Sequence, residues 1–371
     1  MQTSGWRGLD FGLLCLVLLV MAVGVAAIYS ATRFSLAGGE WDWEEPVVRQ
    51  VFYGAVGVIL LLVFAAIDYR VWRRLGWMLY GLMLALLLLL FAVGQVSFGA
   101  RSWFRLTFFP VQPSELAKVL LILVLAGYLS GSSKQDGGLR HLLATTGMVA
   151  LPAILVYLQP DMGTALVMVA IWAGMVFASG TRIRNLLLIG LAGGLATPLV
   201  WSSLKPYMRE RITAFLNPTR DLTGASYNTS QAVISIGSGG LWGKGFGRGT
   251  QSQLQFLRVR HTDFVFSVLA EELGFVGSVL LLLLLTLLLL RIIGVAQRAR
   301  DPYGRLIASG VASMIFFQTF VSLAMNVNLL PVTGLPLPLV SYGGSSLLNT
   351  LIALGLVESV ALRRVEPGFG H

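Results

Sequence analysis

Long apolar runs without charged residues dominate this sequence and restrict what it can fold into. Examples are residues 11–28, 56–67 and 275–290. A helix needs about 20 mostly apolar residues to cross the hydrocarbon core of a bilayer, and these runs form the centres of segments of that length. Hydrophobic residues make up 56% of the chain and charged residues 12%, about half the charged share of a typical soluble domain. The sequence therefore predicts an integral membrane protein.

The apolar runs predict an all-α fold with about ten transmembrane helices. We place them near residues 11–30, 48–67, 77–93, 114–129, 142–158, 163–179, 186–203, 264–291, 306–325 and 345–362. A long segment, 204–262, separates the seventh helix from the eighth. Since no internal repeat is apparent, we expect residues 1–371 to form a single polytopic membrane domain.

Basic residues in the short connections predict the orientation in the membrane. The clusters are Arg70, Arg73 and Arg74; Lys134 and Arg140; Arg182 and Arg184; and Arg298, Arg300 and Arg305. Together with Arg7, Arg363 and Arg364 they fall on one side, which the positive-inside rule assigns to the cytoplasm with both termini. The segment 204–262 is then extracytoplasmic. These residues and their contacts with anionic membrane lipids explain the net charge of +10 without nucleic acid.

The segment 204–262 is more than a linker. Apolar side chains recur at helical spacing beside charged ones in residues 207–216, which predicts an amphipathic helix in the membrane interface. The glycine-rich stretch 237–249 follows, and we expect its backbone to move or to approach a ligand closely. Its Gly243 and Lys244 lack the surrounding residues of a phosphate-binding loop.

Few ionisable residues lie within or at the ends of the predicted helices, and each is a functional candidate because a charge in the membrane is costly. Glu115 and Lys118 are three residues apart at the start of the fourth helix, close enough to pair on one face. Either the pair only neutralises itself, or Lys118 presents a cation to an outward cavity near Arg101. Charge placement alone leaves both interpretations open.

Asp161 and Asp263 each lie where the chain enters a helix. For Asp161 we favour a cap on the sixth helix. Asp263 follows a basic stretch that ends at His261 and precedes an apolar run. It either begins the eighth helix, with Thr262 as the cap, or presents a carboxylate at the water boundary to a basic pocket. Deeper in the eighth helix, Glu271 and its neighbour are expected to bond to other helices.

Six blocks of sequence resemble the signature motifs of the SEDS family (shape, elongation, division and sporulation), and within it the RodA proteins more than the FtsW proteins. They are residues 99–103, 112–118, 159–165, 260–264, 270–274, and 331–338 with 341–345. All but the block 270–274 fall on the predicted outer side. The resemblance covers nearly the whole chain.

The resemblance implies a peptidoglycan glycosyltransferase in the bacterial cytoplasmic membrane, which polymerises lipid II into glycan strands during cell elongation and rod-shape maintenance. It also implies two partners: the growing glycan linked to undecaprenyl pyrophosphate, and a class B penicillin-binding protein that crosslinks the strands. The alternative function is a lipid II flippase. A flippase should present recognition groups on the cytoplasmic face, whereas the unusual residues here lie on the predicted outer side.

The resemblance also implies site residues. Asp263 is the catalytic residue. Expected substrate-binding residues are Arg101, Trp103, Glu115, Lys118, Asp161, Arg258, His261 and Ser341. Asp263 either takes the proton from the acceptor hydroxyl or holds a divalent cation, magnesium or manganese, against the pyrophosphate. The sequence leaves both roles open and assigns no further metal ligand.

The predicted orientation can be tested by accessibility labelling of single cysteines in a variant that lacks Cys15. Cysteines at Arg73 and Arg182 should be protected from an impermeant thiol reagent in intact cells, because both positions are predicted to be cytoplasmic. A cysteine at Gly249 should be labelled. Labelling at Arg182 from outside would contradict the orientation.

Overall fold

The computed structural model describes residues 8–32, 43, 45–93, 95–97, 100–105, 110–131, 139–195, 198, 201–202, 204–216, 226–253, 256 and 261–364. The helices are α1 (Phe11–Thr32), α2 (Pro46–Ala66), α3 (Arg70–Arg74), α4 (Gly76–Val93), α5 (Pro113–Gly131), α6 (Leu139–Leu158), α7 (Met162–Ala178), α8 (Ile183–Leu195), α10 (Pro206–Leu216), α11 (Tyr227–Ser238), α12 (Thr250–Gln253), α13 (Val265–Gln297), α14 (Pro302–Asn326) and α15 (Gly344–Leu362). A small antiparallel sheet has the order β1 (Gln95–Ser97), β2 (Ala100–Arg105), β3 (Pro110–Val111).

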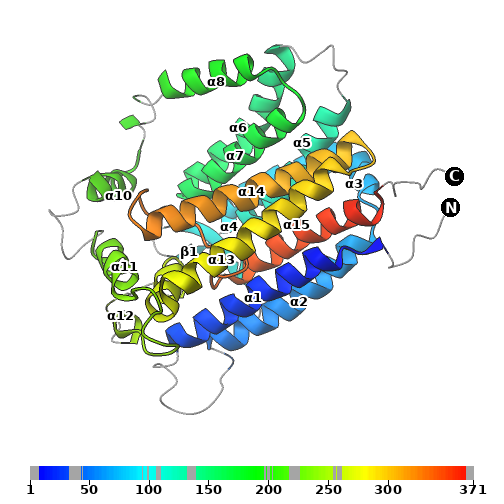
Figure 1. Ribbon diagram of the computed structural model, residues 1–371. Helices are drawn as coiled ribbons and strands as arrows, with labels where there is room; N and C mark the ends of the chain where they lie inside the picture. The colour runs from blue at the N-terminus through cyan, green and yellow to red at the C-terminus, as the bar shows by residue number, and fades with distance from the viewer. Residues whose placement is uncertain are drawn as a thin grey trace.

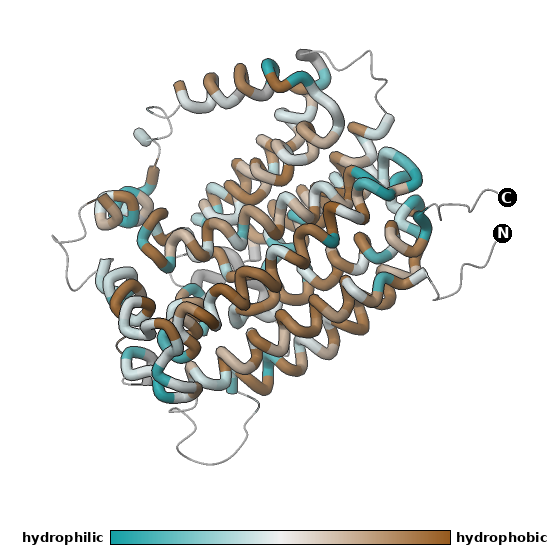
Figure 2. Tube along the Cα trace, viewed as in Figure 1, coloured by the Kyte–Doolittle hydropathy of each residue, from teal (hydrophilic) through white to brown (hydrophobic). Residues whose placement is uncertain are grey.

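The predicted helical membrane fold is confirmed. Each of the ten predicted helices coincides with a helix of the structure, namely α1, α2, α4 to α8, and α13 to α15. Within the described residues, seven helices are long and apolar enough to cross a membrane, and α4 and α7 are shorter apolar helices. Hydrophobic residues fill the middle of the bundle, and hydrophilic residues gather toward its ends (Figure 2). The small sheet was not predicted.

The two ends of the bundle differ. α1 begins and α15 ends at the same end of the bundle, and α10, α11 and α12 lie at the opposite end (Figure 1). The predicted amphipathic helix at 207–216 is confirmed as a helix and is α10, Pro206–Leu216. The long segment between α8 and α13 thus carries short helices that gather at one end.

The seventh predicted helix, 186–203, is longer than the helix observed. α8 ends at Leu195 and has 13 residues, roughly 20 Å at 1.5 Å per residue. Residue 198 and residues 201–202 are helical as well. α8 lies apart from the rest of the bundle (Figure 1), and Leu187, Leu191 and Leu195 are exposed on it.

α13 is longer than predicted, and it is interrupted at Gly274. This residue has a φ of 68° and non-helical geometry, which a residue with a side chain rarely adopts. The 33 residues of α13 would extend about 50 Å as a straight helix, whereas residues 275–297 alone extend about 34 Å, close to the thickness of the bilayer core. Glu271 and Glu272 interrupt the apolar run just before Gly274, but the prediction placed them inside one continuous helix.

The glycine-rich stretch 237–249 packs backbone to backbone against this break. The amide of Lys244 donates to the carbonyl of Glu271 at 3.0 Å. A Cβ atom on Gly243 would lie 2.1 Å from the carbonyl oxygen of Glu272. The close approach that we expected of these glycines is therefore made to α13 of the same chain.

The block 270–274 consequently lies with the long segment, so the expectation that it stands apart from the segment predicted to be outside is wrong. Lys244 Nζ is 2.8 Å from Glu271 Oε1, and the Ser30 hydroxyl oxygen on α1 lies 2.6 Å from each carboxylate oxygen of Glu272 and donates its single proton to this carboxylate. Glu272 therefore bonds to a neighbouring helix as expected, whereas Glu271 bonds to the long segment.

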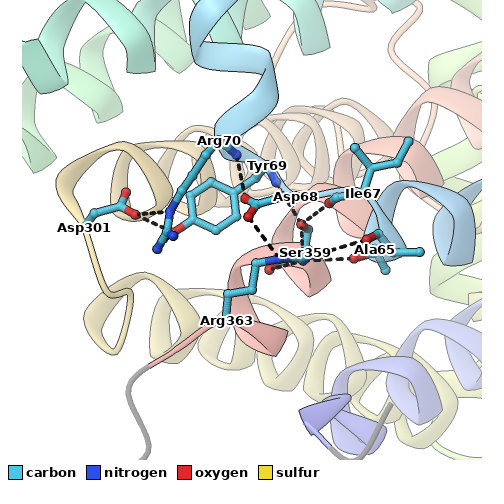
Figure 3. A network of polar contacts seen from close by, with 9 residues as sticks. Ala65, Ile67, Asp68, Tyr69, Arg70, Asp301, Ser359 and Arg363 are labelled. Atoms are coloured by element: carbon cyan, nitrogen blue, oxygen red, sulfur yellow. Dashed lines mark hydrogen bonds and ion pairs between the residues drawn. The ribbon is translucent and has the colours of Figure 1, made fainter. Parts of the chain in front are cut away.

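A polar network closes the end of the bundle where α15 ends (Figure 3). The Tyr69 hydroxyl donates to Asp301 Oδ2 at 2.5 Å, and Arg70 Nε donates to the same oxygen at 3.1 Å. Burial, together with the bond to Asp301, raises the pKa of Tyr69 to about 12. Burial alone would raise the pKa of Asp301, but the hydrogen bonds from Tyr69, the Gly304 amide and Arg70 lower it below its ordinary value.

Arg363 extends this network to the end of α2. Its guanidinium donates to the carbonyls of Ala65 and Ala66 at 3.2 and 2.8 Å and to the Ser359 hydroxyl at 2.8 Å. Helix C-termini leave such carbonyls without intrahelical partners. The network joins connections that the charge pattern had placed on one side, so they do share one end of the bundle, and the cytoplasmic assignment of that end stays a prediction.

Candidate functional site

Asp263 lies in the turn that leads into α13, at the end of the bundle that carries α11. The first turn of α13 takes a capping bond from another helix, because the Ser267 amide donates to Asn326 Oδ1 at 3.2 Å. The Ser267 hydroxyl donates to the same oxygen at 2.7 Å, and Asn326 Nδ2 donates to the Asp263 carbonyl at 2.9 Å. Asn326 thus fixes the start of α13 without the Asp263 carboxylate, which weakens the interpretation of Asp263 as a cap.

The Asp263 side chain is half-buried and electrostatically coupled to Arg211 of α10. Burial raises the pKa of Asp263 above its ordinary value, while the positive charge of Arg211 and a hydrogen bond from Thr262 oppose this rise. A carboxylate with a raised pKa is a stronger base, and a pKa closer to neutral pH favours proton transfer at that pH. The site therefore favours proton transfer more than an ordinary surface aspartate would.

The non-helical segment 331–343 crosses the same end of the bundle and is largely buried. Leu337 and Ser341 are 1% and 4% exposed. Irregular backbone at such depth is tolerated where protein surrounds it. Gly24 of α1 permits the approach, because a Cβ atom there would lie 2.8 Å from the Val340 carbonyl oxygen.

His261 contacts Tyr342, the residue that follows Ser341 in this segment. The amide of Tyr342 donates to the His261 carbonyl at 2.9 Å, and the His261 and Tyr342 rings are 5.6 Å apart at 64°. The Ser341 hydroxyl accepts from the Leu337 amide at 2.9 Å. Of two predicted substrate-binding residues, His261 thus lies two residues before Asp263 and contacts the neighbour of Ser341, while the Ser341 hydroxyl bonds within its own segment.

Asp161 caps α7 and ties it to the start of α5. Its Oδ1 accepts from the Thr164 amide at 3.0 Å, which confirms the predicted cap. Its Oδ2 accepts from Gln112 Nε2 at 2.9 Å and from the Ser114 hydroxyl at 3.2 Å. The backbone amide of Gln112 in turn donates to the Ser345 hydroxyl of α15 at 3.1 Å. These bonds place Asp161 at the same end of the bundle, and its predicted contact with substrate stays a prediction.

Glu115 and Lys118 form the predicted ion pair on α5. Lys118 Nζ is 2.8 Å from Glu115 Oε1, and the side chains are only 2% and 4% exposed. The pair lies next to the residues that hold Asp161. Its neutralising role is evident from this geometry, and a role in substrate binding stays a prediction.

The side chains of three predicted substrate-binding residues lie outside the described part of the structure. The backbone of Arg101 and Trp103 belongs to β2, where Arg101 pairs with Val96 of β1, but their side chains lie outside the described part of the structure. Arg258 lies outside the described residues altogether.

Two residues of this site were missed by sequence reasoning. The only sequence feature that pointed to Arg211 was its place among the charged residues of the amphipathic helix. Asn326 had no such feature beyond its place at the end of an apolar run. Both act on Asp263 across long separations in the chain, 63 residues for Asn326, and such contacts leave no local pattern.

The structure describes no group of three or more His, Cys, Asp or Glu side chains that could hold a metal ion, within the residues it places. Magnesium is often held by one or two carboxylates together with substrate phosphates and water. Asp263 fits that arrangement as a single ligand, so a divalent cation remains compatible with the site without being required by it.

The fold and the site define a class of protein: an all-helical, multi-pass membrane protein with a half-buried carboxylate in the turn before α13. The family model described as "Cell cycle protein" for FtsW, RodA and SpoVE matches residues 11–366. This chain belongs to that family.

Relatives and a solved structure match over nearly the full length. Peptidoglycan glycosyltransferase MrdB of Escherichia coli K12 is 38% identical over 364 residues, covering 96% of this chain and 94% of the relative. Stage V sporulation protein E of Bacillus subtilis 168 is 36% identical over 359 residues, covering 95% and 96%. A chain of a peptidoglycan synthase complex has a TM-score of 0.82 at 38% identity, covering 96% of this chain and 98% of that chain.

The buried ion pair on α5 generates a prediction about stability. Lys118→Met should destabilise the protein by about 3 to 5 kcal/mol, because it leaves the Glu115 carboxylate buried and unpaired. The double variant Glu115→Gln with Lys118→Met should recover most of the loss, measured by thermal unfolding in one detergent. A double variant no more stable than Lys118→Met would contradict this account.

Loss of lipid II polymerisation in a stable double variant would support the predicted role in substrate binding.

Proposed function

We propose that this peptidoglycan glycosyltransferase polymerises lipid II into glycan strands at the outer face of the cytoplasmic membrane during cell elongation. The observation that carries the proposal is Asp263, a half-buried carboxylate beside Arg211 at the membrane boundary. The cap of α13 is supplied by Asn326, so the carboxylate is available for chemistry.

Glycosyl transfer requires that an acceptor hydroxyl lose its proton and that a leaving group gain negative charge. Asp263 is suited to the first task, because burial raises its pKa and a general base works best near its own pKa. Pyrophosphate is the leaving group of lipid II. Cations stabilise such charge as it develops, and Arg211 supplies one near Asp263.

The outer-face location rests on the distribution of charge. The basic connections share the end of the bundle where α15 ends, through the Arg70 to Asp301 and Arg363 contacts, and the positive-inside rule assigns such an end to the cytoplasm. Asp263 then faces outward, where a lipid-linked sugar substrate would present its head group. Both termini are cytoplasmic in this orientation.

The role in elongation rests on the greater resemblance to RodA proteins, carried by residues 261–264. Identities to the MrdB and sporulation relatives are close to each other, 38% and 36%, so overall identity does not separate elongation from other roles. A class B penicillin-binding protein is the partner we propose, and the similarity to a chain of a peptidoglycan synthase complex supports an assembly of this kind.

One reconstitution tests the function, the alternative and the partner together. Purified protein in liposomes with labelled lipid II should yield glycan polymer. Polymerisation should rise with the elongation class B penicillin-binding protein of the same bacterium and less, or not at all, with the division one, because only the matched partner should engage the protein. Translocated lipid II without polymer would instead indicate the flippase, and stimulation only by the division partner would contradict the role in elongation.

A further inference from the structure

Two large apolar side chains, Leu241 and Trp242, lie exposed at the surface of the glycine-rich stretch 237–249. Leu241 is 66% exposed and Trp242 is 79% exposed. Apolar side chains that are exposed together to this extent mark contact with another protein or with a membrane. The position of this turn beside the break in α13 distinguishes the two.

Four backbone hydrogen bonds join the turn to α13 across the break at Gly274. They run from the amides of Phe275 and Val276 to the carbonyls of Gly240 and Leu241, at 2.9 and 3.2 Å, and from the amides of Lys244 and Gly245 to the carbonyls of Glu271 and Glu272, both at 3.0 Å. In a continuous helix the first two amides would bond to the last two carbonyls. Residues 240–245 thus pair the groups that the break separates, and this fixes the turn to α13.

The part of α13 that follows the break presents an apolar face to the bilayer. Phe275, Val279 and Leu283 are 63%, 44% and 51% exposed, and their spacing of four residues puts them on one side of the helix. Residues 275–297 extend about 34 Å, close to the thickness of the bilayer core. Phe275 therefore lies near the boundary of that core, and Leu241 and Trp242 continue the lipid-facing surface there.

α1 places the same stretch at the same level. The ring of Phe246 stacks on that of Tyr29, with centroids 6.3 Å apart and planes at 16°. Tyr29 is three residues from the end of α1 at Thr32, at the end of the bundle that carries α11 and α12 (Figure 1). Since aromatic side chains gather at the boundary between membrane and water, contacts with two different helices agree on the depth of the stretch.

The charges of the stretch are compatible with this depth. Lys244 Nζ is 2.8 Å from Glu271 Oε1, and the Glu271 side chain is fully buried. Arg248 is exposed, and an arginine side chain is long enough to extend its charge to anionic head groups. Non-helical backbone next to lipid also requires paired polar groups, and the four bonds across the break provide pairs.

We propose that the Leu241–Trp242 turn is a membrane anchor, whose two side chains insert between the head groups and the acyl chains of the adjacent leaflet at the level of Phe275. The ligand is the phospholipid bilayer. The anchor holds the glycine-rich stretch, and with it the break in α13, at a fixed depth. This inference goes beyond the proposed function and does not depend on it.

Spin labels on single cysteines test the anchor in a parent protein that lacks Cys15. The labelled variants are Trp242→Cys, with Leu283→Cys as the reference in lipid and Arg300→Cys as the reference in water. The protein alone is placed in liposomes of phosphatidylethanolamine and phosphatidylglycerol. Oxygen concentrates in lipid and nickel ethylenediaminediacetate stays in water, so the label at 242 should collide with oxygen as the one at 283 does. Its ratio of oxygen to nickel collisions should be several-fold above that at 300.

Two results would overturn the anchor. A collision ratio at 242 equal to that at 300 would place the turn in water, as expected of a surface that binds a soluble partner domain. A label that neither reagent reaches would mean that protein covers the turn. If Trp242→Cys does not fold, Leu241→Cys carries the same expectations and the same contradicting results.

A second measurement leaves the turn without a label. The emission of Trp242 is obtained as the difference between the parent and Trp242→Phe in the same liposomes. This emission should be quenched by lipids brominated near the head-group end of their acyl chains and should resist iodide in the water. Quenching by iodide alone, or by neither reagent, would contradict insertion. Neither measurement uses lipid II, so each decides the anchor even in protein that makes no polymer.

Discussion

Asn326 at the last turn of α14 forms four hydrogen bonds on which the candidate site depends. Its carboxamide oxygen accepts from the amide and hydroxyl of Ser267, and its nitrogen donates to the carbonyls of Asp263 and Ser322. Asn326 is fully buried, where an unpaired amide would be costly. These bonds fix the turn before α13 to α14, and they supply the helix cap that Asp263 would otherwise have to provide.

The rest of this end of the bundle is built around close backbone contacts. The buried segment 331–343 reaches α1 at Gly24, and α7 at Gly163, where a Cβ atom would lie 2.9 Å from the Thr333 carbonyl oxygen. The glycine-rich stretch 237–249 reaches the break in α13 in the same way. Non-helical backbone can therefore lie at the end of a helical bundle with its polar groups paired inside the protein. The result is a closely packed frame near the half-buried carboxylate of Asp263.

Hydropathy and charge predicted the helices and the position of Asp263, because both depend on local sequence. A long apolar run favours a membrane-spanning helix whatever its tertiary contacts, and the change from basic to apolar residues at Asp263 marks the predicted start of a span. The break at Gly274 could not be predicted in this way, since the two glutamates before it also fit a continuous helix and the break packs against the distant Gly243. The coupling of Arg211 to Asp263 and the cap from Asn326 likewise depend on tertiary contacts between distant segments.

The central claim is that the negative charge of Asp263 serves chemistry and not folding. The variant Asp263→Asn keeps the size of the side chain and leaves the cap from Asn326 in place, so the protein should still fold. Polymerisation of lipid II and thermal unfolding should be measured on the same preparation. The matched control is Asp68→Asn, at the opposite end of the bundle. We expect Asp263→Asn to lose at least about a hundredfold in rate, the usual contribution of a general base, with unfolding unchanged and the control active. An Asp263→Asn variant that folds and polymerises within a few-fold of the parent would contradict the account.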